Sequence, residues 1–451
     1  MKNNNGENYE AIETVYRADF ADSAERSKWE RKFAYENLSP FFKEDEKGLT
    51  MAGNGGINTF GWYSRNVPVK GGKRYLLRTV FSVVGIDDIN LHILNLLTWR
   101  IKGRPESSPA QDNVTYYRIE GGYIVGEQAF VCHGDTYSVD IQLLLRHCPD
   151  GSVTWKSAEL ICVEPQKKRP VRVSATKWQV RLCAGKEDHR KKAKILVEKA
   201  AAEKSDIIVL PEFASYYDYS AEAVSAAEKV PGGEFCQFLS DQAKKHEINI
   251  AAGILELAED GTTYNTCVIF DRNGEYVGAY RKVHLYWPET MFNGTTPGDD
   301  FPVFDLDFGR VGVMICYDCW YGECARLLAL KGAEVILFPA AGYEEKLLPA
   351  RAIDNNVYIV CAQLNSSSYI LDTKGECLAK IDQSSDFGVE TAEIDLSVRQ
   401  LPHVNAGGTM NSGSGGRRSA RNSRSDKIYR EITQEMGTWE NRREYSTWVY
   451  M

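Results

Sequence analysis

The pattern of the chain changes at residues 164–170, Glu-Pro-Gln-Lys-Lys-Arg-Pro. Two prolines and three adjacent cations do not suit a buried strand, so this segment is predicted to be an exposed linker. A length of 451 residues exceeds what one core usually organises, and 43% hydrophobic residues can fill two. We therefore predict an all-β domain over 1–165, a second domain over 171–400 and a C-terminal arm over 401–451.

The first domain has short apolar segments separated by turn signals, such as Gly-Asn-Gly-Gly at 53–56. Near its end, the apolar Val139, Ile141, Leu143 and Leu145 recur at every second position. This spacing is typical of a strand with one buried face. The pattern predicts a β-sandwich or jelly-roll-like accessory domain.

The aromatic residues of this domain allow two interpretations. They could form a carbohydrate-stacking face, but aromatic side chains of β-sandwiches more often belong to the core. Two other roles of this domain are also open, namely covering a neighbouring site and mediating assembly. The residues concerned are Phe60, Trp62, Tyr63, Trp99, Tyr116, Tyr117 and Tyr123.

After the linker, strand patterns alternate with helix patterns. Residues 171–178 and 206–210 read as strands, with a charged, Ala-rich amphipathic helix over 186–204 between them. Later strands are expected at 248–257, 310–315 and 334–338, helices at 233–245 and 321–331, and a hairpin through 271–274. This alternation indicates a layered α/β domain with a mixed sheet.

Composition argues against several classes of partner. The 62 acidic and 54 basic residues give a formal charge of −8, so no broad positive field favours nucleic acid. The first residues lack the apolar run of a secretory signal, and no stretch has the length of a membrane-spanning helix. Eleven irregularly spaced cysteines favour a reducing cytoplasm.

Three residues are candidates for catalysis. Cys316 follows an apolar strand and precedes a predicted helix, whose N-terminal amides would favour thiolate and bind an oxyanion. Glu212 ends the buried strand Ile-Ile-Val-Leu-Pro-Glu, which suits a general base. Lys282 follows a hairpin strand and could stabilise thiolate and oxyanion. Each residue alone has an ordinary structural explanation, so their joint order carries the argument.

In that order, the sequence resembles the nitrilase superfamily, the carbon-nitrogen hydrolases. The matching strings are Ile-Ile-Val-Leu-Pro-Glu-Phe at 207–213, Tyr-Arg-Lys-Val-His-Leu at 280–285 and Gly-Val-Met-Ile-Cys-Tyr-Asp at 312–318. The resemblance covers residues 171–396. It implies a four-layer αββα sandwich, with Glu212 as general base, Lys282 as oxyanion stabiliser and Cys316 as nucleophile.

The same resemblance implies further properties. Glu289, seven residues after Lys282, would be a second catalytic carboxylate that orients the lysine or positions water. The substrate would be a small amide, carbamoyl compound or nitrile, and neither a metal nor another cofactor would be needed. Relatives pair through the helices that flank the nucleophile, so a homodimer or higher homo-oligomer is expected.

The substrate pocket is expected around Trp287, Tyr317, Trp320 and Glu323, close in sequence to Glu289 and Cys316. Two tryptophans indicate an aromatic wall, but sequence alone leaves the substrate open. His284 lies beside Lys282, and because this chemistry needs no histidine we expect a structural hydrogen-bonding role for it.

Alternative functions remain at this point. Cys316 and Cys319 form a Cys-x-x-Cys motif that could be a redox pair or half a zinc site, although only Cys324 adds a nearby ligand. An amine that attacks the thioester would make the protein an acyltransferase, and the same cysteine could add to a nitrile. A carbohydrate-binding protein with an inactive hydrolase domain belongs to a different class.

Overall fold

The computed structural model describes residues 9–105, 110–114, 117–179, 182–216, 225–342 and 345–397. The predicted arm at 401–451 and the aromatic residue Tyr116 lie outside these ranges. Within the described part, no helix combines the length and the apolar character needed to cross a bilayer.

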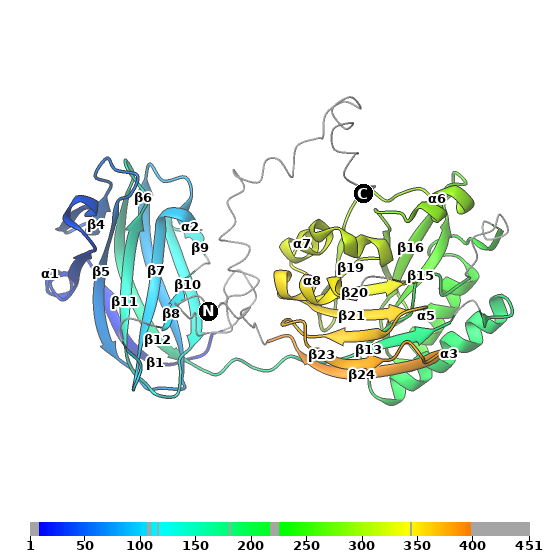
Figure 1. Ribbon diagram of the computed structural model, residues 1–451. Coiled ribbons are helices and arrows are strands. Elements are labelled where there is room, and N and C mark those ends of the chain that lie inside the picture. The colour runs from blue at the N-terminus through cyan, green and yellow to red at the C-terminus, as the bar shows by residue number, and fades with distance from the viewer. Residues whose placement is uncertain are drawn as a thin grey trace, which may run out of the picture.

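Residues 11–163 form two antiparallel sheets that enclose one hydrophobic core (Figure 1). One sheet has the order β3-β4-β12-β6-β10-β9, with β1 paired to β12, and the other has the order β2-β5-β11-β7-β8. The strands are β1 (Ala11–Asp19), β2 (Glu30–Phe33), β3 (Phe41–Asp45), β4 (Gly48–Ala52), β5 (Phe60–Pro68), β6 (Arg74–Val84), β7 (Ile93–Ile101), β8 (Ala110–Asn113), β9 (Tyr117–Glu120), β10 (Tyr123–Val131), β11 (Thr136–Arg146) and β12 (Ser152–Val163); the short helices are α1 (Ser23–Arg26), η1 (Glu36–Leu38) and α2 (Ile89–His92). The predicted β-sandwich is confirmed.

The core of the sandwich contains the alternating residues of β11. Val139, Ile141, Leu143 and Leu145 are all fully buried, as the two-residue spacing predicts. Among the aromatic residues, Tyr63 and Trp99 are also in this core and cannot stack on a ligand. Tyr123, by contrast, is 41% exposed.

A buried polar contact links the two sheets. Nε1 of Trp155 in β12 donates a hydrogen bond of 2.9 Å to Oδ1 of Asn95 in β7. Both residues are completely buried, so neither group can turn to bulk water if its partner is removed.

We predict that Trp155→Phe destabilises this sandwich by about 2–3 kcal/mol, because Oδ1 of Asn95 loses its donor and ring area is lost. Hydrogen exchange of β6 and β12 amides, measured by mass spectrometry, should become at least about 30-fold faster.

Trp62→Phe is the matched control. Nε1 of Trp62 has no hydrogen-bond partner among the described residues, and its ring is only half-buried. We expect a clearly smaller change in exchange. Equal effects of the two substitutions would show that the contact with Asn95 contributes nothing.

Residues 170–395 form a third, mixed sheet of twelve strands. Its order is β17-β16-β15-β14-β13-β21-β20-β19-β18, with β22 and β23 continuing from β21 and β24 paired to β13. The strands are β13 (Pro170–Trp178), β14 (Ile207–Val209), β15 (Asn249–Leu257), β16 (Thr263–Phe270), β17 (Tyr276–Arg281), β18 (Val303–Leu306), β19 (Gly309–Val313), β20 (Val335–Ala340), β21 (Tyr358–Gln363), β22 (Ser368–Leu371), β23 (Cys377–Ile381) and β24 (Phe387–Asp395); the helices are α3 (Lys186–Ala202), α5 (Glu234–His246), α6 (Trp287–Asn293), η3 (Cys316–Trp320), α7 (Gly322–Leu330) and α8 (Leu347–Asn355).

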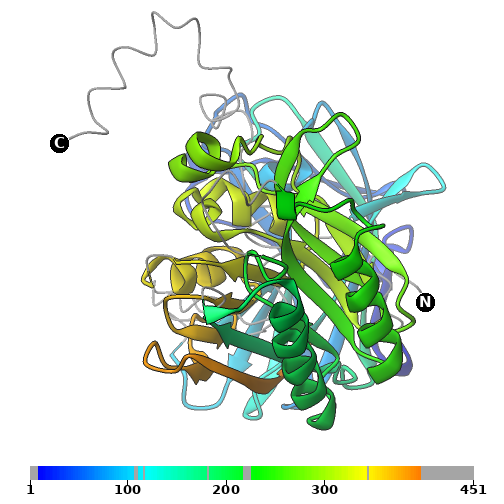
Figure 2. The ribbon, with the colours of Figure 1, turned by 90° about the vertical axis from the view of Figure 1, so that its right-hand side faces the viewer.

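This sheet folds over itself, so that β14 and β15 contact β20 across an apolar layer. In β14, Ile207 and Val209 face this layer, whereas Ile208 packs against α3 and α5 on the outer face. Helices α7 and α8 cover the other half of the sheet (Figures 1 and 2). The result is the expected αββα arrangement.

The direction of the strands determines where the candidate residues meet. Strands β14, β13, β21, β20 and β19 are mutually parallel, so their carboxyl ends lie at the same edge of the folded sheet. Glu212 follows β14, Cys316 follows β19 and the segment 341–342 follows β20. Parallel sheets commonly place their sites at this edge.

Candidate functional site

A buried lysine bridges two buried glutamates at this edge. Nζ of Lys282 lies 2.9 Å from Oε1 of Glu212 and 2.6 Å from Oε2 of Glu289. Each of the three side chains is about 99% buried, since only 1% is exposed. Paired charges with short contacts are the arrangement that a low-dielectric interior tolerates.

Asn265 in β16 completes the cluster. Its Nδ2 donates to Oε1 of Glu212 at 2.7 Å and to Oε1 of Glu289 at 2.6 Å. The two carboxylates are therefore bridged twice, by the ammonium of Lys282 and by the side-chain amide of Asn265. Sequence reasoning missed this residue, because nothing in Tyr-Asn-Thr shows where the asparagine points.

Cys316 is joined to the cluster by the segment after β20. Its Sγ donates to the carbonyl of Gly342 at 3.0 Å, and the preceding amide of Ala341 donates to Oε2 of Glu212 at 2.6 Å. Cys316 has φ 46°, a left-handed conformation that is rare for a residue with a side chain. The turn thus directs the sulfur towards the carbonyl of Gly342. The residue before Gly342, Ala341, is the one whose amide binds Glu212.

The charges of the cluster act on one another. Burial, followed by the charge of Glu212, raises the pKa of the Cys316 thiol, while Lys282 opposes this effect. Burial alone would lower the pKa of Lys282, but the charges of Glu212 and Glu289 hold it well above its ordinary value. Burial also raises the pKa of Glu289, against the effect of Lys282. The resting site therefore combines a neutral thiol with a charged ammonium.

This result corrects one sequence-based expectation. The α-helix after Cys316 was predicted to favour the thiolate, but Cys316 is the first residue of the short 3-10 helix η3, and α7 begins only at Gly322. Cys316 is half-buried, and partial loss of hydration together with the nearby charge of Glu212 raises the pKa of its thiol instead of lowering it. A thiol of this kind needs a base at the moment of attack.

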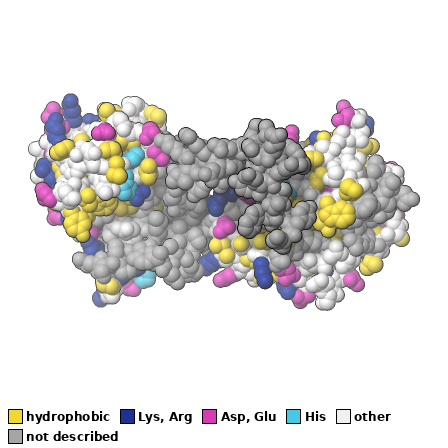
Figure 3. Space-filling view, turned by 45° about the horizontal axis from the view of Figure 1, so that its top comes forward, with side chains coloured by type: hydrophobic (Ala, Val, Ile, Leu, Met, Phe, Trp, Pro, Cys, Tyr) yellow, Lys and Arg dark blue, Asp and Glu magenta, His cyan; other side chains and the backbone are white. Residues whose placement is uncertain are grey.

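The four predicted pocket residues lie on α6, η3 and the first turn of α7. Tyr317 contacts Tyr286 and Trp320, with ring centroids 5.9 and 6.4 Å apart. Trp287 and Trp320 are 60% and 53% exposed, and Glu323 is also exposed. Hydrophobic side chains reach the surface of both halves of the molecule in Figure 3.

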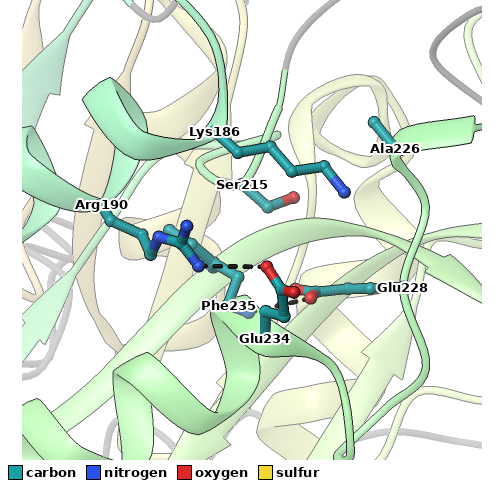
Figure 4. A pocket seen from close by; sticks show the side chains of 7 residues that line it. All are labelled: Lys186, Arg190, Ser215, Ala226, Glu228, Glu234 and Phe235. Carbon is teal, nitrogen blue, oxygen red and sulfur yellow. Dashed lines mark hydrogen bonds and ion pairs between the residues drawn. The ribbon is translucent and has the colours of Figure 1, made fainter.

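A separate small pocket lies near Ser215, three residues after Glu212 (Figure 4). Its space of about 10 Å³ fits about one water molecule. Arg190 and Glu234 form an ion pair of 3.1 Å beside it. Oγ of Ser215 and Oε1 of Glu228 lack hydrogen-bond partners among the described residues, which a single water could supply. Glu212, Lys282 and Cys316 do not line this pocket.

Glycine at position 253 lets β15 approach Glu212. A Cβ at this position would lie 2.6 Å from Cα of Glu212 and 2.8 Å from the carbonyl oxygen of Pro211. Both atoms belong to the backbone, so a larger residue would have to displace the glutamate.

Comparison with known proteins identifies the family of this chain. The sequence pattern of the carbon-nitrogen hydrolase family matches residues 178–402. A nitrilase of Pyrococcus abyssi is 38% identical over 231 residues, which cover 48% of this chain and 86% of that protein. The human omega-amidase NIT2 is 32% identical over 255 residues, or 50% of this chain and 89% of its own length.

A solved structure, that of Nit3 from Saccharomyces cerevisiae, covers 52% of this chain and 96% of its own. It has 27% sequence identity and a TM-score of 0.47. The class that the fold defines is that of layered α/β proteins. The nitrilase of Pyrococcus abyssi is 38% identical to this chain, which covers 86% of that protein. The chain therefore belongs to the carbon-nitrogen hydrolase family of the nitrilase superfamily.

We predict that Gly253→Ala lowers turnover of a primary amide at least about tenfold, because the backbone of Glu212 must move by several tenths of an ångström. Ammonia release would measure the effect. Gly232→Ala is the matched control, since nothing lies within 4 Å of a Cβ at that position. Equal activity of the two variants would contradict the importance of this close approach.

Proposed function

We propose that this protein hydrolyses the carbon-nitrogen bond of a small amide or N-carbamoyl compound through a thioester on Cys316. The observation that carries the proposal is the ammonium of Lys282, held between two buried carboxylates beside the thiol. Glu212 would be the general base, Lys282 the oxyanion stabiliser and Glu289 a supporting carboxylate.

In the first half of the reaction, Glu212 takes the thiol proton as Cys316 attacks the carbonyl carbon. The resulting oxyanion is stabilised by Lys282 and by the backbone amide of Tyr317. As the carbon-nitrogen bond breaks, Glu212 returns the proton to the nitrogen. Ammonia or an amine leaves, and the acyl group remains as a thioester.

In the second half, Glu212 removes a proton from water as the water attacks the thioester carbon. The second tetrahedral oxyanion is stabilised in the same way. Its collapse expels the sulfur of Cys316, which regains a proton from Glu212. The product is a carboxylic acid, or a carbamic acid when the substrate is an N-carbamoyl compound.

Glu289 and Asn265 would keep the charged groups in place during both halves. The contact of 2.6 Å between Glu289 and Lys282 fixes the ammonium, and Asn265 holds both carboxylates at fixed positions. Preorganised groups of this kind need no reorientation when charge develops on the substrate.

The substrate would bind beside the aromatic residues that follow Lys282 and Cys316. Tyr317, Trp287 and Trp320 offer exposed or half-buried ring surface to an uncharged substituent, and Glu323 lies at the rim. Nitrile hydrolysis and transfer of the acyl group to an amine use the same cysteine, and a substrate screen distinguishes them.

The proposal also includes the domain organisation, the oligomeric state and the compartment of the protein. Residues 1–165 would be an accessory domain, 171–400 the catalytic domain and 401–451 an arm, with the protein acting as a homodimer or larger homo-oligomer. A reducing compartment such as the cytoplasm suits the eleven cysteines, all of which are free thiols.

We predict that Cys316→Ala folds but loses turnover by at least about four orders of magnitude, because no other group can form the thioester. Amides, N-carbamoyl compounds and nitriles would be screened for ammonia release with the wild-type protein and this variant. Activity of Cys316→Ala equal to that of the wild type would remove the cysteine from the mechanism.

A second expected outcome concerns pH. Since burial raises the pKa of the Cys316 thiol above 9.0, its thiolate fraction grows only at alkaline pH. Alkylation of Cys316 by iodoacetamide, followed by mass spectrometry of its peptide, should accelerate with pH and show no plateau below about pH 9. A plateau near neutral pH would instead indicate a preformed thiolate.

A further inference from the structure

A fully buried aspartate lies two residues after the nucleophile and outside the proposed chemistry. Asp318 is in η3, with none of its surface exposed. Its Oδ2 accepts from the hydroxyl of Tyr280 at 2.7 Å and from the backbone amide of Ile315 at 2.9 Å. Its Oδ1 accepts from the amide of His284 at 3.1 Å and lies 2.9 Å from Nδ1 of the same residue.

These contacts connect two segments that are far apart in the sequence. Tyr280 and His284 lie two residues before and two residues after Lys282, and Ile315 immediately precedes Cys316. The amide of Val283 also donates to the hydroxyl of Tyr280, at 3.2 Å. One carboxylate therefore holds the side chain of Tyr280 before the lysine, the backbone amide of His284 after it, and the turn that carries the sulfur.

The same residues could be considered as a metal site, because ligand atoms of His284, Asp318 and Cys324 lie within 4.8 Å of one another. However, each oxygen of Asp318 already has two donors, and one donor on each oxygen is a backbone amide in a fixed turn. A cation would have to displace such donors. The arrangement favours a hydrogen-bonding centre over a metal centre.

One of these donors, the hydroxyl of Tyr280, is protonated under ordinary conditions. Burial, followed by the charge of Asp318, holds the pKa of Tyr280 well above its ordinary value, so the hydroxyl keeps its proton. Because a carboxylate can only accept, the contact with His284 assigns the ring proton to Nδ1. The predicted structural role of His284 is thus confirmed as a hydrogen bond to Asp318.

We propose that Asp318 is a positioning residue that sets the distance between the ammonium of Lys282 and the sulfur of Cys316. The inference rests on the proposed function, in which both groups act on one substrate carbonyl. Asp318 does not touch the substrate. It acts through the side chain of Tyr280 and the backbone of His284 and Ile315, which it binds together.

The test is Asp318→Asn, which keeps the size of the side chain. In this variant an amide nitrogen replaces one carboxylate oxygen, and an amide nitrogen cannot accept a hydrogen bond. The donors that faced that oxygen are left unpaired, and the segment that carries them must move away. We expect kcat for the best amide substrate to fall at least about 100-fold, with KM changed less than about threefold. Cooperative thermal unfolding should be retained.

A measurement without substrate separates this proposal from the proposed function. Alkylation of Cys316 by iodoacetamide at pH 9 should become at least about tenfold slower, because displaced Lys282 no longer favours the thiolate. The exposed Cys377 is the internal reference and should react at an unchanged rate. If the wild-type protein hydrolyses none of the amides, the alkylation rate of Cys316 alone tests the role of Asp318.

Asp372→Asn is the matched control, since Asp372 is also buried and accepts the amides of Lys374 and Glu376 in the turn between β22 and β23. It should leave kcat and Cys316 alkylation unchanged. Should Asp318→Asn not fold, Tyr280→Phe removes one donor and is expected to lower both rates by a smaller factor. Unchanged rates for Cys316 in the folded variant would overturn the proposal.

Discussion

The structure of the second half of the chain depends on one buried interaction, the ammonium of Lys282 between the carboxylates of Glu212 and Glu289. Removing an ammonium from water is very costly unless opposite charges replace the lost hydration. Here two carboxylates do so, and the side-chain amide of Asn265 donates to both of them as well. Because these residues follow or belong to different strands, the cluster fixes the end of β14, the start of β16 and the end of β17 relative to α6.

The fold supplies the close packing that this cluster needs. Parallel strands bring Glu212, Cys316 and the segment after β20 to one edge, and Gly253 lets a neighbouring strand pass against the backbone of Glu212. The amide of Ala341 binds Glu212 while the carbonyl of Gly342 binds Cys316. Glu212 and Cys316, the proposed base and nucleophile, are therefore held by successive residues of one short segment, which limits their relative movement.

The electrostatics of the cluster explain why its parts belong together in the proposed reaction. A buried thiol near a carboxylate stays neutral, and a buried lysine between carboxylates stays charged. In the proposed reaction, such a site forms the thiolate only when Glu212 removes the proton in the presence of substrate. Asp318 adds a second buried carboxylate centre, which joins the segments that carry the lysine and the sulfur.

The sequence by itself determined the class of each half and the identity of the candidate residues. Alternating apolar positions such as Val139 and Ile141 fix which face of a strand is buried, and three ordered strings placed Glu212, Lys282 and Cys316 at strand ends. Tertiary structure alone decided that Asn265 bridges the glutamates, that Tyr63 and Trp99 belong to the core and that the thiol of Cys316 has a raised pKa. Periodicity reports only the local burial of a face, whereas hydrogen-bond partners and the charges around a group depend on which distant segments pack against it.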